Sequence, residues 1–187
     1  MKPLLRFEDV ALRRGGRLLF ERLSFELGPG ERLQVTGPNG SGKSSLIRLA
    51  AGLLRAERGA VVRSPLALAD DAPALDRELA LKRALAFWSA TAATALDAVG
   101  LEHLAQVPVR LLSSGQLKRA TLARVAGSGA PLWLLDEPLN ALDVEGARKL
   151  GLIVDRHLES GGAVLAASHQ RLGGEWRQLE LGQRQTA

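Results

Sequence analysis

Eight residues at positions 37–44, with the sequence Gly-Pro-Asn-Gly-Ser-Gly-Lys-Ser, have the types and spacing of a loop that holds phosphate groups. Glycines let backbone N–H groups approach phosphate oxygens, and the helix expected from Ser45 onward adds the positive end of its dipole. Lys43 can offer a charge to the β- and γ-phosphates, and the Ser44 hydroxyl can ligate Mg²⁺. We therefore predict a nucleoside triphosphate site made by Gly37, Pro38, Asn39, Gly40, Ser41, Gly42, Lys43, Ser44 and Ser45.

Two adjacent carboxylates follow an unbroken apolar run at residues 132–135. Such a run is typical of a strand buried on both faces, so Asp136 and Glu137 are expected at its carboxyl end. There Asp136 can hold Mg²⁺, directly or through water, and Glu137 can orient or deprotonate the water that attacks the γ-phosphate. An acidic pair alone is as easily a helix cap, and the phosphate loop is what favours the chemical interpretation.

A second polar segment precedes the helix predicted at residues 114–126. Ser113, Gly115 and Gln116 stand where free N–H groups of that helix and a serine hydroxyl can face an anion. The ordinary interpretation of Ser113 is a helix N-cap, and both roles can hold together. His169 follows a predicted strand at 163–167, where a lone histidine is usually structural, so its interest depends on the other motifs.

Composition favours one globular domain without disulfides. The chain has 187 residues, of which 46% are hydrophobic and 24% are charged, and it contains no cysteine. We expect a cytosolic protein with no signal peptide and no membrane-spanning segment. The net charge of +5 would suit nucleic acid or an anionic membrane. Short clusters such as Arg13-Arg14 and Lys118-Arg119 are nevertheless scattered, which favours a solvated surface and no nucleic-acid partner.

The pattern of the remaining chain predicts strands that alternate with helices. Apolar and polar residues alternate on either side of Gly15-Gly16, which predicts an antiparallel pair at the start. Predicted strands lie at 5–12, 18–27, 31–36, 60–63, 132–135 and 163–167, and predicted helices at 45–54, 78–99, 114–126 and 144–159. The first strand, loop, helix and strand after the antiparallel pair form a β-loop-α-β unit, and the alternation as a whole favours a mainly parallel sheet. Residues from 173 onward form a polar tail with no predicted structure.

The order of the motifs closely resembles that of the nucleotide-binding domain of ATP-binding cassette (ABC) proteins, over nearly the whole chain. The resemblance implies an α/β fold of the P-loop NTPase class and ABC ATPase type, with an N-terminal antiparallel β part. It implies a single domain at 1–187, with a helical subdomain inserted at about 73–126. ATP and Mg²⁺ would be the cofactors, with Lys43, Glu137 and His169 catalytic and Ser44 and Asp136 holding the metal.

The same resemblance implies an ATP-dependent homodimer that encloses two ATP molecules. Ser113 and Gly115 of one copy, with Gln116 beside them, would contact the γ-phosphate held by the other copy. His169 would hydrogen-bond the γ-phosphate, and Asp143 would belong to a loop that communicates across the dimer.

Two positions depart from the family pattern. An aromatic residue usually stacks on adenine near the Gly15 turn, but here Arg14 stands in that place; a stacked and a solvated Arg14 are both open. The glutamine expected after the third strand is also absent, because residues 66–71 read Leu-Ala-Leu-Ala-Asp-Asp. Either Asp70 or Asp71 replaces it, or coupling to the membrane partner is altered.

Longer phrases are similar to the ATPase subunits of cytochrome c biogenesis haem exporters; they lie at 19–25, 34–40, 130–138, 161–164 and 168–170. This implies a peripheral protein at the cytoplasmic side of the inner membrane, docked on integral membrane transporter subunits. ATP hydrolysis would drive haem export or haem-chaperone release. Haem would be handled by those partners, because the chain has no cysteine and no haem-ligand motif. His103 and His157 are expected in helical, exposed contexts.

Alternatives remain open at this point. The chain could serve another small ABC transporter, for lipoprotein release or import, or it could be a soluble ABC protein acting on ribosomes or DNA. A catalytically inactive subunit is disfavoured because Lys43, Asp136, Glu137 and His169 are all present. Phe87 and Trp88 could face a membrane partner or belong to the core.

Overall fold

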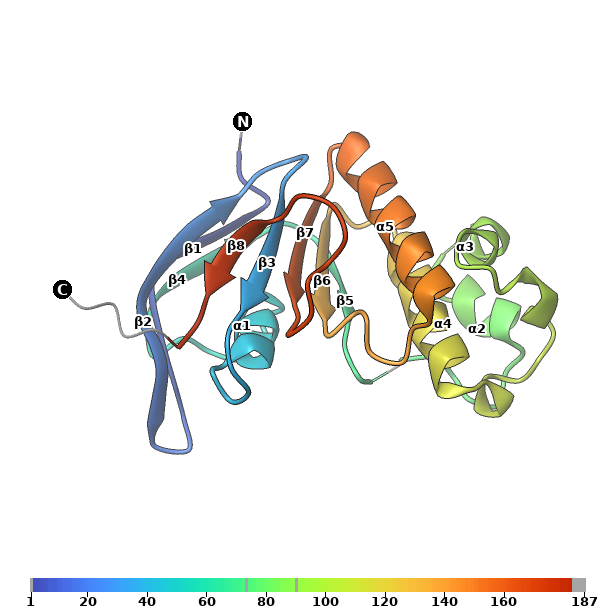
Figure 1. Ribbon diagram of the computed structural model, residues 1–187, viewed down its shortest axis with the longest axis horizontal. Helices are drawn as coiled ribbons and strands as arrows, with labels where there is room; N and C mark the ends of the chain where they lie inside the picture. Colours follow the sequence, from blue (N-terminus) through green and yellow to red (C-terminus); the bar gives the residue numbers. More distant parts are fainter. Residues whose placement is uncertain (1, 73, 90, 183–187) are drawn as a thin grey trace.

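Five parallel strands form the centre of the computed structural model, which describes residues 2–72, 74–89 and 91–182 (Figure 1). Their order across the sheet is β5-β6-β7-β3-β8. The bounds are β3 (Arg32–Thr36), β5 (Leu66–Ala69), β6 (Leu132–Asp136), β7 (Ala163–Ala167) and β8 (Arg177–Glu180). In the register, Ala167 of β7 pairs with Val35 of β3 on one side and with Asp136 of β6 on the other. The segments that leave these three strands therefore start side by side.

A second, antiparallel sheet lies beside the first and consists of β1 (Leu5–Arg14), β2 (Arg17–Leu27) and β4 (Arg58–Arg63), in the order β2-β1-β4. The hairpin between β1 and β2 turns at Gly15 and Gly16, both with positive φ, as the sequence predicted. Helix α1 (Lys43–Ala50) lies between the two sheets (Figure 1). Its apolar residues pack into a core with the inner faces of both sheets.

Strand β6 separates the two hydrophobic cores of the chain. Leu132 and Leu134 point into the core around α1, and Trp133 and Leu135 point into the other core, as the alternation of a strand requires. The second core is covered by α4 (Ser114–Ala126) and α5 (Val144–Glu159). An unbroken apolar strand is thus explained by burial on both faces, and the predicted bounds of both helices are confirmed.

The helical insert differs from the single long helix predicted at 78–99, which is wrong. The structure has two short helices, α2 (Leu81–Ala86) and α3 (Ala92–Ala98), followed by the 3₁₀ turns η1 (Glu102–Leu104) and η2 (Val109–Leu111). Between α2 and α3 the hydroxyl of Ser89 accepts a hydrogen bond from the Thr91 N–H at 3.0 Å. Serine and threonine side chains that bind the backbone in this way compete with helix formation.

One strand prediction is wrong, and two further strands were not predicted. The strand after α1 does not continue the parallel sheet, because β4 pairs antiparallel with β1; its largely exposed residues do not suit a buried parallel strand. The segment at 66–69 was not predicted as a strand, yet β5 pairs with β6. The polar tail also contains a strand, since β8 pairs in parallel with β3. As an edge strand β8 is mostly exposed, which explains why no apolar pattern marked it.

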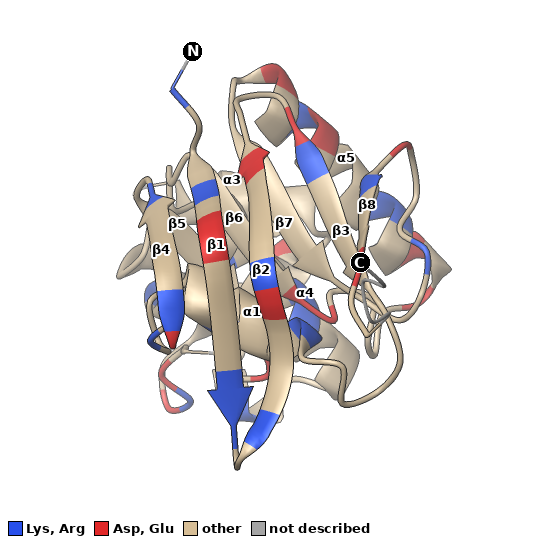
Figure 2. Cartoon of the chain, turned by 90° about the vertical axis from the view of Figure 1, so that its left-hand side faces the viewer, with Lys and Arg blue, Asp and Glu red and all other residues tan. Residues whose placement is uncertain are grey.

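Charges of both signs are mixed on the outer face of the antiparallel sheet (Figure 2). Arg6 contacts Glu8 at 3.1 Å and Glu26 at 2.7 Å there. This face is therefore not a continuous basic surface, despite the positive net charge. Within the described ranges, none of the helices combines the length and the apolar character needed to cross a bilayer.

His157 lies against the core, so the expectation that it is exposed is wrong, whereas His103 is exposed as expected. The imidazole stacks on Trp133 with ring centroids 3.8 Å apart, and its buried Nε2 has no hydrogen-bond partner among the described residues. Burial lowers the pKa of the His157 imidazole below its usual value of 6.5. The folded protein therefore favours the neutral ring.

This pKa predicts that acid destabilises the fold through His157. The unfolded chain takes up the proton more readily, so the stability is present above about pH 6.5 and is lost as the pH falls. We expect the free energy of unfolding to drop between about pH 7.5 and pH 5.5, and His157→Phe to reduce that drop. Urea unfolding at both values, with His103→Phe as the control, measures it. An equal drop in His157→Phe and the unmodified chain would exclude His157 as the cause.

Candidate nucleotide-binding and hydrolysis site

The predicted phosphate loop connects β3 to α1 at the carboxyl end of the parallel sheet. Gly37, Gly40 and Gly42 all have positive φ, at 135°, 78° and 105°. A Cβ on Gly37 would lie 2.3 Å from the carbonyl oxygen of Leu181, and one on Gly42 would lie 3.2 Å from the Cβ of Leu19. The loop conformation therefore requires glycine at these positions before any ligand is considered.

Lys43 is folded back over this loop and is only 7% exposed. Its Nζ donates hydrogen bonds to the carbonyl oxygens of Gly37 at 2.9 Å and Pro38 at 3.2 Å. Nearby, the buried hydroxyl of Ser41 has no hydrogen-bond partner within the described residues. The loop therefore contains two donors, the Lys43 ammonium group, which can exchange its carbonyl partners, and the Ser41 hydroxyl, which has none among the described residues. Both suit a ligand rich in acceptor oxygens.

Ser44 and Asp136 bring two side-chain oxygens together between the loop and β6. The Ser44 Oγ donates to Asp136 Oδ1 at 3.0 Å. Burial raises the pKa of the Asp136 carboxyl, and the hydrogen bond from Ser44 opposes that shift. In the described part of the chain, no group of three or more His, Cys, Asp or Glu residues could hold a metal. A few protein oxygens supplemented by phosphate and water are what Mg²⁺ prefers, so this pair fits Mg²⁺.

Glu137 and His169 meet because β6 and β7 are neighbours. Glu137 Oε2 lies 2.8 Å from His169 Nδ1, and the Glu137 N–H donates to the carbonyl of Ala167 at 2.8 Å. Glu137 has φ of +44°, a left-handed conformation that is uncommon outside glycine. Backbone strain of this kind persists only where the surroundings enforce it, and it concentrates at functional sites. The two predicted catalytic side chains therefore form one hydrogen-bonded unit.

An open cleft of about 430 Å³ brings several of these residues together. That volume is in the range of small-molecule sites. The cleft is lined by Arg14, Leu19, Asn39, Gly40, Gly42, Lys43, Ser44, Ser45 and Glu137. Arg14, from the end of β1, therefore lines the same cleft as the phosphate loop, and its contact with the base stays a prediction. Leu19, at the start of β2, was not predicted, because an apolar residue in a strand carries no chemical signal.

Ser113, Gly115 and Gln116 are not among the residues that line this cleft. They form the start of α4, where Ser113 Oγ accepts from the Gln116 N–H at 3.3 Å and Gln116 Oε1 accepts from the Ser113 N–H at 2.9 Å. This capping box confirms the helix-cap interpretation of Ser113. Contact of these residues with a phosphate stays a prediction, and it requires a cleft other than the one in their own chain.

Lys118 was predicted to be a solvated surface residue, and that prediction is wrong. Its side chain is buried on α4, and Nζ donates to the carbonyl oxygen of Asp136 at 3.2 Å. The helical spacing carried a signal that was overlooked, because Lys118 shares a face with the buried Thr121, Leu122 and Val125. Lys118 is therefore a polar group at the site that sequence reasoning missed.

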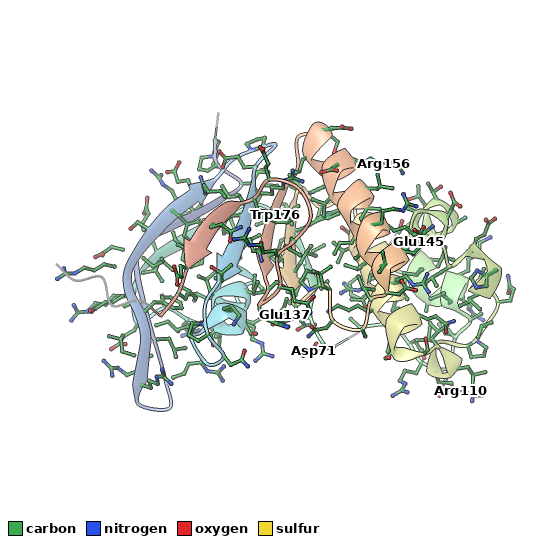
Figure 3. The ribbon with its side chains drawn as sticks, in the orientation of Figure 1. Asp71, Arg110, Glu137, Glu145, Arg156 and Trp176 are labelled. Carbon is green, nitrogen blue, oxygen red and sulfur yellow. The ribbon has the colours of Figure 1, made fainter. Side chains whose placement is uncertain are left out.

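The two carboxylates that follow β5 behave differently. Asp70 Oδ1 accepts a hydrogen bond from the Ala72 N–H at 3.1 Å and so closes its own loop. Burial is the larger cause of the raised pKa of Asp136, and the negative charge of Asp71 raises it further. The same charge raises the pKa of Lys118, but the larger effect of burial lowers that pKa overall. Figure 3 shows Asp71 and Glu137 toward the same end of the parallel sheet. Asp71 is therefore the better placed of the two to act at the site.

Comparison with known proteins assigns the family. The ABC transporter family model matches residues 20–140. The cytochrome c biogenesis ATP-binding export protein CcmA of Sphingopyxis alaskensis is 52% identical over 177 residues, covering 90% of this chain and 91% of the relative. The protein of the same name from Novosphingobium aromaticivorans is 53% identical, covering 88% of this chain and 87% of the relative.

A solved structure supports the fold independently of sequence. It is a dimeric ATP-binding cassette in a post-hydrolysis state with ADP and Pi, and it superposes with a TM-score of 0.80 at 21% identity. The superposition covers 95% of this chain and 94% of the solved chain. The predicted α/β P-loop NTPase fold of ABC ATPase type is thereby confirmed. The chain belongs to the ABC transporter family, within its group of cytochrome c biogenesis ATP-binding export proteins.

Proposed function

We propose that this chain is the ATP-hydrolysing subunit of a membrane transporter that drives haem export or haem-chaperone release in cytochrome c biogenesis. The observation that carries the proposal is the Glu137–His169 pair, which places Glu137 on the cleft formed by the phosphate loop. Relatives of 40–53% identity that bear the cytochrome c biogenesis name favour this cargo over lipoprotein release or import. The chain acts as one domain, since strands of the parallel sheet contribute to both cores.

The arrangement suits hydrolysis of a triphosphate bound over the loop. Phosphate oxygens replace the carbonyl partners of Lys43, and Ser44 and Asp136 hold Mg²⁺. The metal supplies charge neutralisation for the phosphates. Glu137 accepts a proton from the attacking water, and His169 holds the Glu137 carboxylate and hydrogen-bonds the γ-phosphate. Arg14 contacts the base from the edge of the cleft.

The site becomes complete in a homodimer that forms with ATP. The capped start of α4 carries Ser113, and its side chain is exposed and lies outside the cleft of its own chain. A second copy can bring this helix start, with its free N–H groups, to the γ-phosphate. Asp143, which caps α5 by accepting from the Gly146 N–H at 2.7 Å, belongs to the segment that follows Glu137 toward the partner copy.

The membrane subunits handle the haem, and this chain works at the cytoplasmic side of the inner membrane as a peripheral protein. His157 is partly buried, its ring stacks on Trp133 and its Nε2 is buried, so that nitrogen is not presented to a haem. The docking surface includes Phe87, which is 83% exposed and stacks edge-on against Trp88. The core interpretation of Phe87 is therefore wrong. An exposed aromatic pair on the helical insert suits a protein partner.

Replacing the proposed catalytic carboxylate separates hydrolysis from binding. We expect Glu137→Gln to lower kcat for ATP hydrolysis by about a hundredfold or more, because only the water-orienting charge is lost. ATP affinity should remain, and a nucleotide-bound dimer should accumulate. Phosphate release and gel filtration with ATP measure both effects, with Glu145→Gln on the exposed side of α5 as the control. Unchanged turnover would contradict the assignment.

Replacing Lys43 tests whether the phosphate loop binds the nucleotide. We expect Lys43→Ala to raise the Kd for ATP by about tenfold or more, because a charge-assisted contact to phosphate is lost. Direct titration with a fluorescent ATP analogue measures the change. Lys82→Ala, at an exposed position of α2, should leave the Kd unaltered. An unchanged Kd in Lys43→Ala would show that the phosphates bind elsewhere.

The membrane proteins that co-purify with the chain test whether the transporter handles haem. We expect the chain, purified from membranes in mild detergent, to retain integral membrane subunits of a haem-handling system. Mass spectrometry of the retained proteins and a haem absorbance spectrum of the complex measure this. Replacing Phe87 by Ser should weaken the association, since an exposed aromatic side chain is removed from the docking surface. Recovery of lipoprotein-release or import subunits instead would overturn the haem assignment.

A further inference from the structure

Lys118 is a buried charged side chain that the proposed mechanism does not use. It lies in the second turn of α4 and is 9% exposed. Its Nζ donates to the main-chain carbonyl of Asp136, which belongs to the peptide group that joins Asp136 to Glu137. A buried ammonium group is costly unless it is paired, and an apolar side chain of similar length would fill the space at lower cost. The position of the hydrogen bond therefore needs an explanation.

Acidic groups surround this ammonium and make burial tolerable. Burial lowers the pKa of Lys118, while the charges of Asp71, Asp136, Glu137 and Asp70 raise it. All four carboxylates lie at the carboxyl ends of β5 and β6, where the proposed chemistry takes place. Lys118 is thus a buried cation that the fold places beside Asp136 and Glu137, with a direct hydrogen bond to the main chain between them.

Helix α4 also touches the far end of the segment that contains Glu137. At Gly115 an added Cβ would lie 2.7 Å from the carbonyl oxygen of Ala141. Glu137 and Ala141 both have positive φ, at 44° and 62°. The segment from Glu137 to Ala141 is therefore strained near both ends and rests on one helix at both ends, under Lys118 and under Gly115. Such strain needs surrounding contacts to maintain it.

We propose that Lys118 is a positioning residue for ATP hydrolysis, which fixes the Asp136–Glu137 peptide so that the Glu137 carboxylate stays on the nucleotide cleft. Lys118 does not touch the nucleotide in this role. It acts through Glu137, and the inference rests on the proposed function of that residue. A misplacement of the catalytic group by a fraction of an ångström to one ångström is enough to reduce turnover strongly.

The first experiment compares Lys118→Met with Lys82→Met, which removes the same charge from an exposed position of α2. We expect Lys118→Met to lower kcat by about tenfold while the Kd for ATP changes less than about twofold, because the phosphate loop is untouched. Lys82→Met should keep both values. Lys118→Arg, which retains a cationic donor, should recover most of the turnover. Wild-type kcat in Lys118→Met would overturn the proposal.

The second experiment asks whether Lys118 acts through Glu137. In a Glu137→Gln background the catalytic carboxylate is already gone, so adding Lys118→Met should change the residual hydrolysis by less than about twofold. A purely structural effect of Lys118 would instead lower hydrolysis by the same factor in both backgrounds. Equal factors would therefore overturn the proposal.

Folding and the proposed function are controlled separately. Tm and circular dichroism are recorded for every variant, and if Lys118→Met does not fold, Lys118→Leu, which also removes the donor to the Asp136 carbonyl, replaces it in both experiments under the same criteria. An unmodified chain with no ATP hydrolysis, or a Glu137→Gln variant with full activity, would refute the proposed function itself. Normal behaviour of those two proteins combined with equal effects of the Lys118 variant in both backgrounds would refute only the positioning role.

Discussion

The parallel register of β3, β7 and β6 is the constraint on which the site depends. Ala167 pairs with Val35 and with Asp136, so the phosphate loop, His169 and Glu137 all leave the sheet at the same level. A shift of one residue between β6 and β7 would turn Glu137 to the opposite face and break its 2.8 Å contact with His169. The two hydrophobic cores on either side of β6 maintain this register, because each takes alternate residues of the strand.

The polar groups of the site are paired with one another in the structure. Lys43 holds carbonyl oxygens of its own loop, Ser44 holds Asp136, and Glu137 holds His169. Each of these partners can be exchanged for a phosphate oxygen, a metal ion or a water molecule when a nucleotide enters. The raised pKa of Asp136 and the positive φ of Glu137 show that the fold tolerates unfavourable features here. Such features are expected where function, and not stability, selects the residues.

The sequence predicted those parts of the fold that carry a local signal. Helices α4 and α5 were located from their helical sequence pattern, and the buried strand β6 from its unbroken apolar run. The loop, Asp136, Glu137 and His169 were located from residue type and order. The edge strand β8 and the short strand β5 were missed, because their pairing is long-range and their patterns are weak. Lys118 was predicted to be solvated from its charge alone, although it lies on the buried face of α4. The prediction that Ser113 contacts the nucleotide of a second copy came from the family resemblance, because no local sequence pattern indicates it.

The division of the site between two copies is the central claim, and mixed dimers test it most directly. One chain carries Lys43→Ala, and the other carries Ser113→Glu, whose carboxylate would repel the γ-phosphate; each alone should be inactive. In a mixed dimer one composite site carries both changes and the other is intact, so equal mixing should restore about one quarter of the normal ATP hydrolysis. No recovery on mixing, with mixed dimers shown to form, would contradict a shared site.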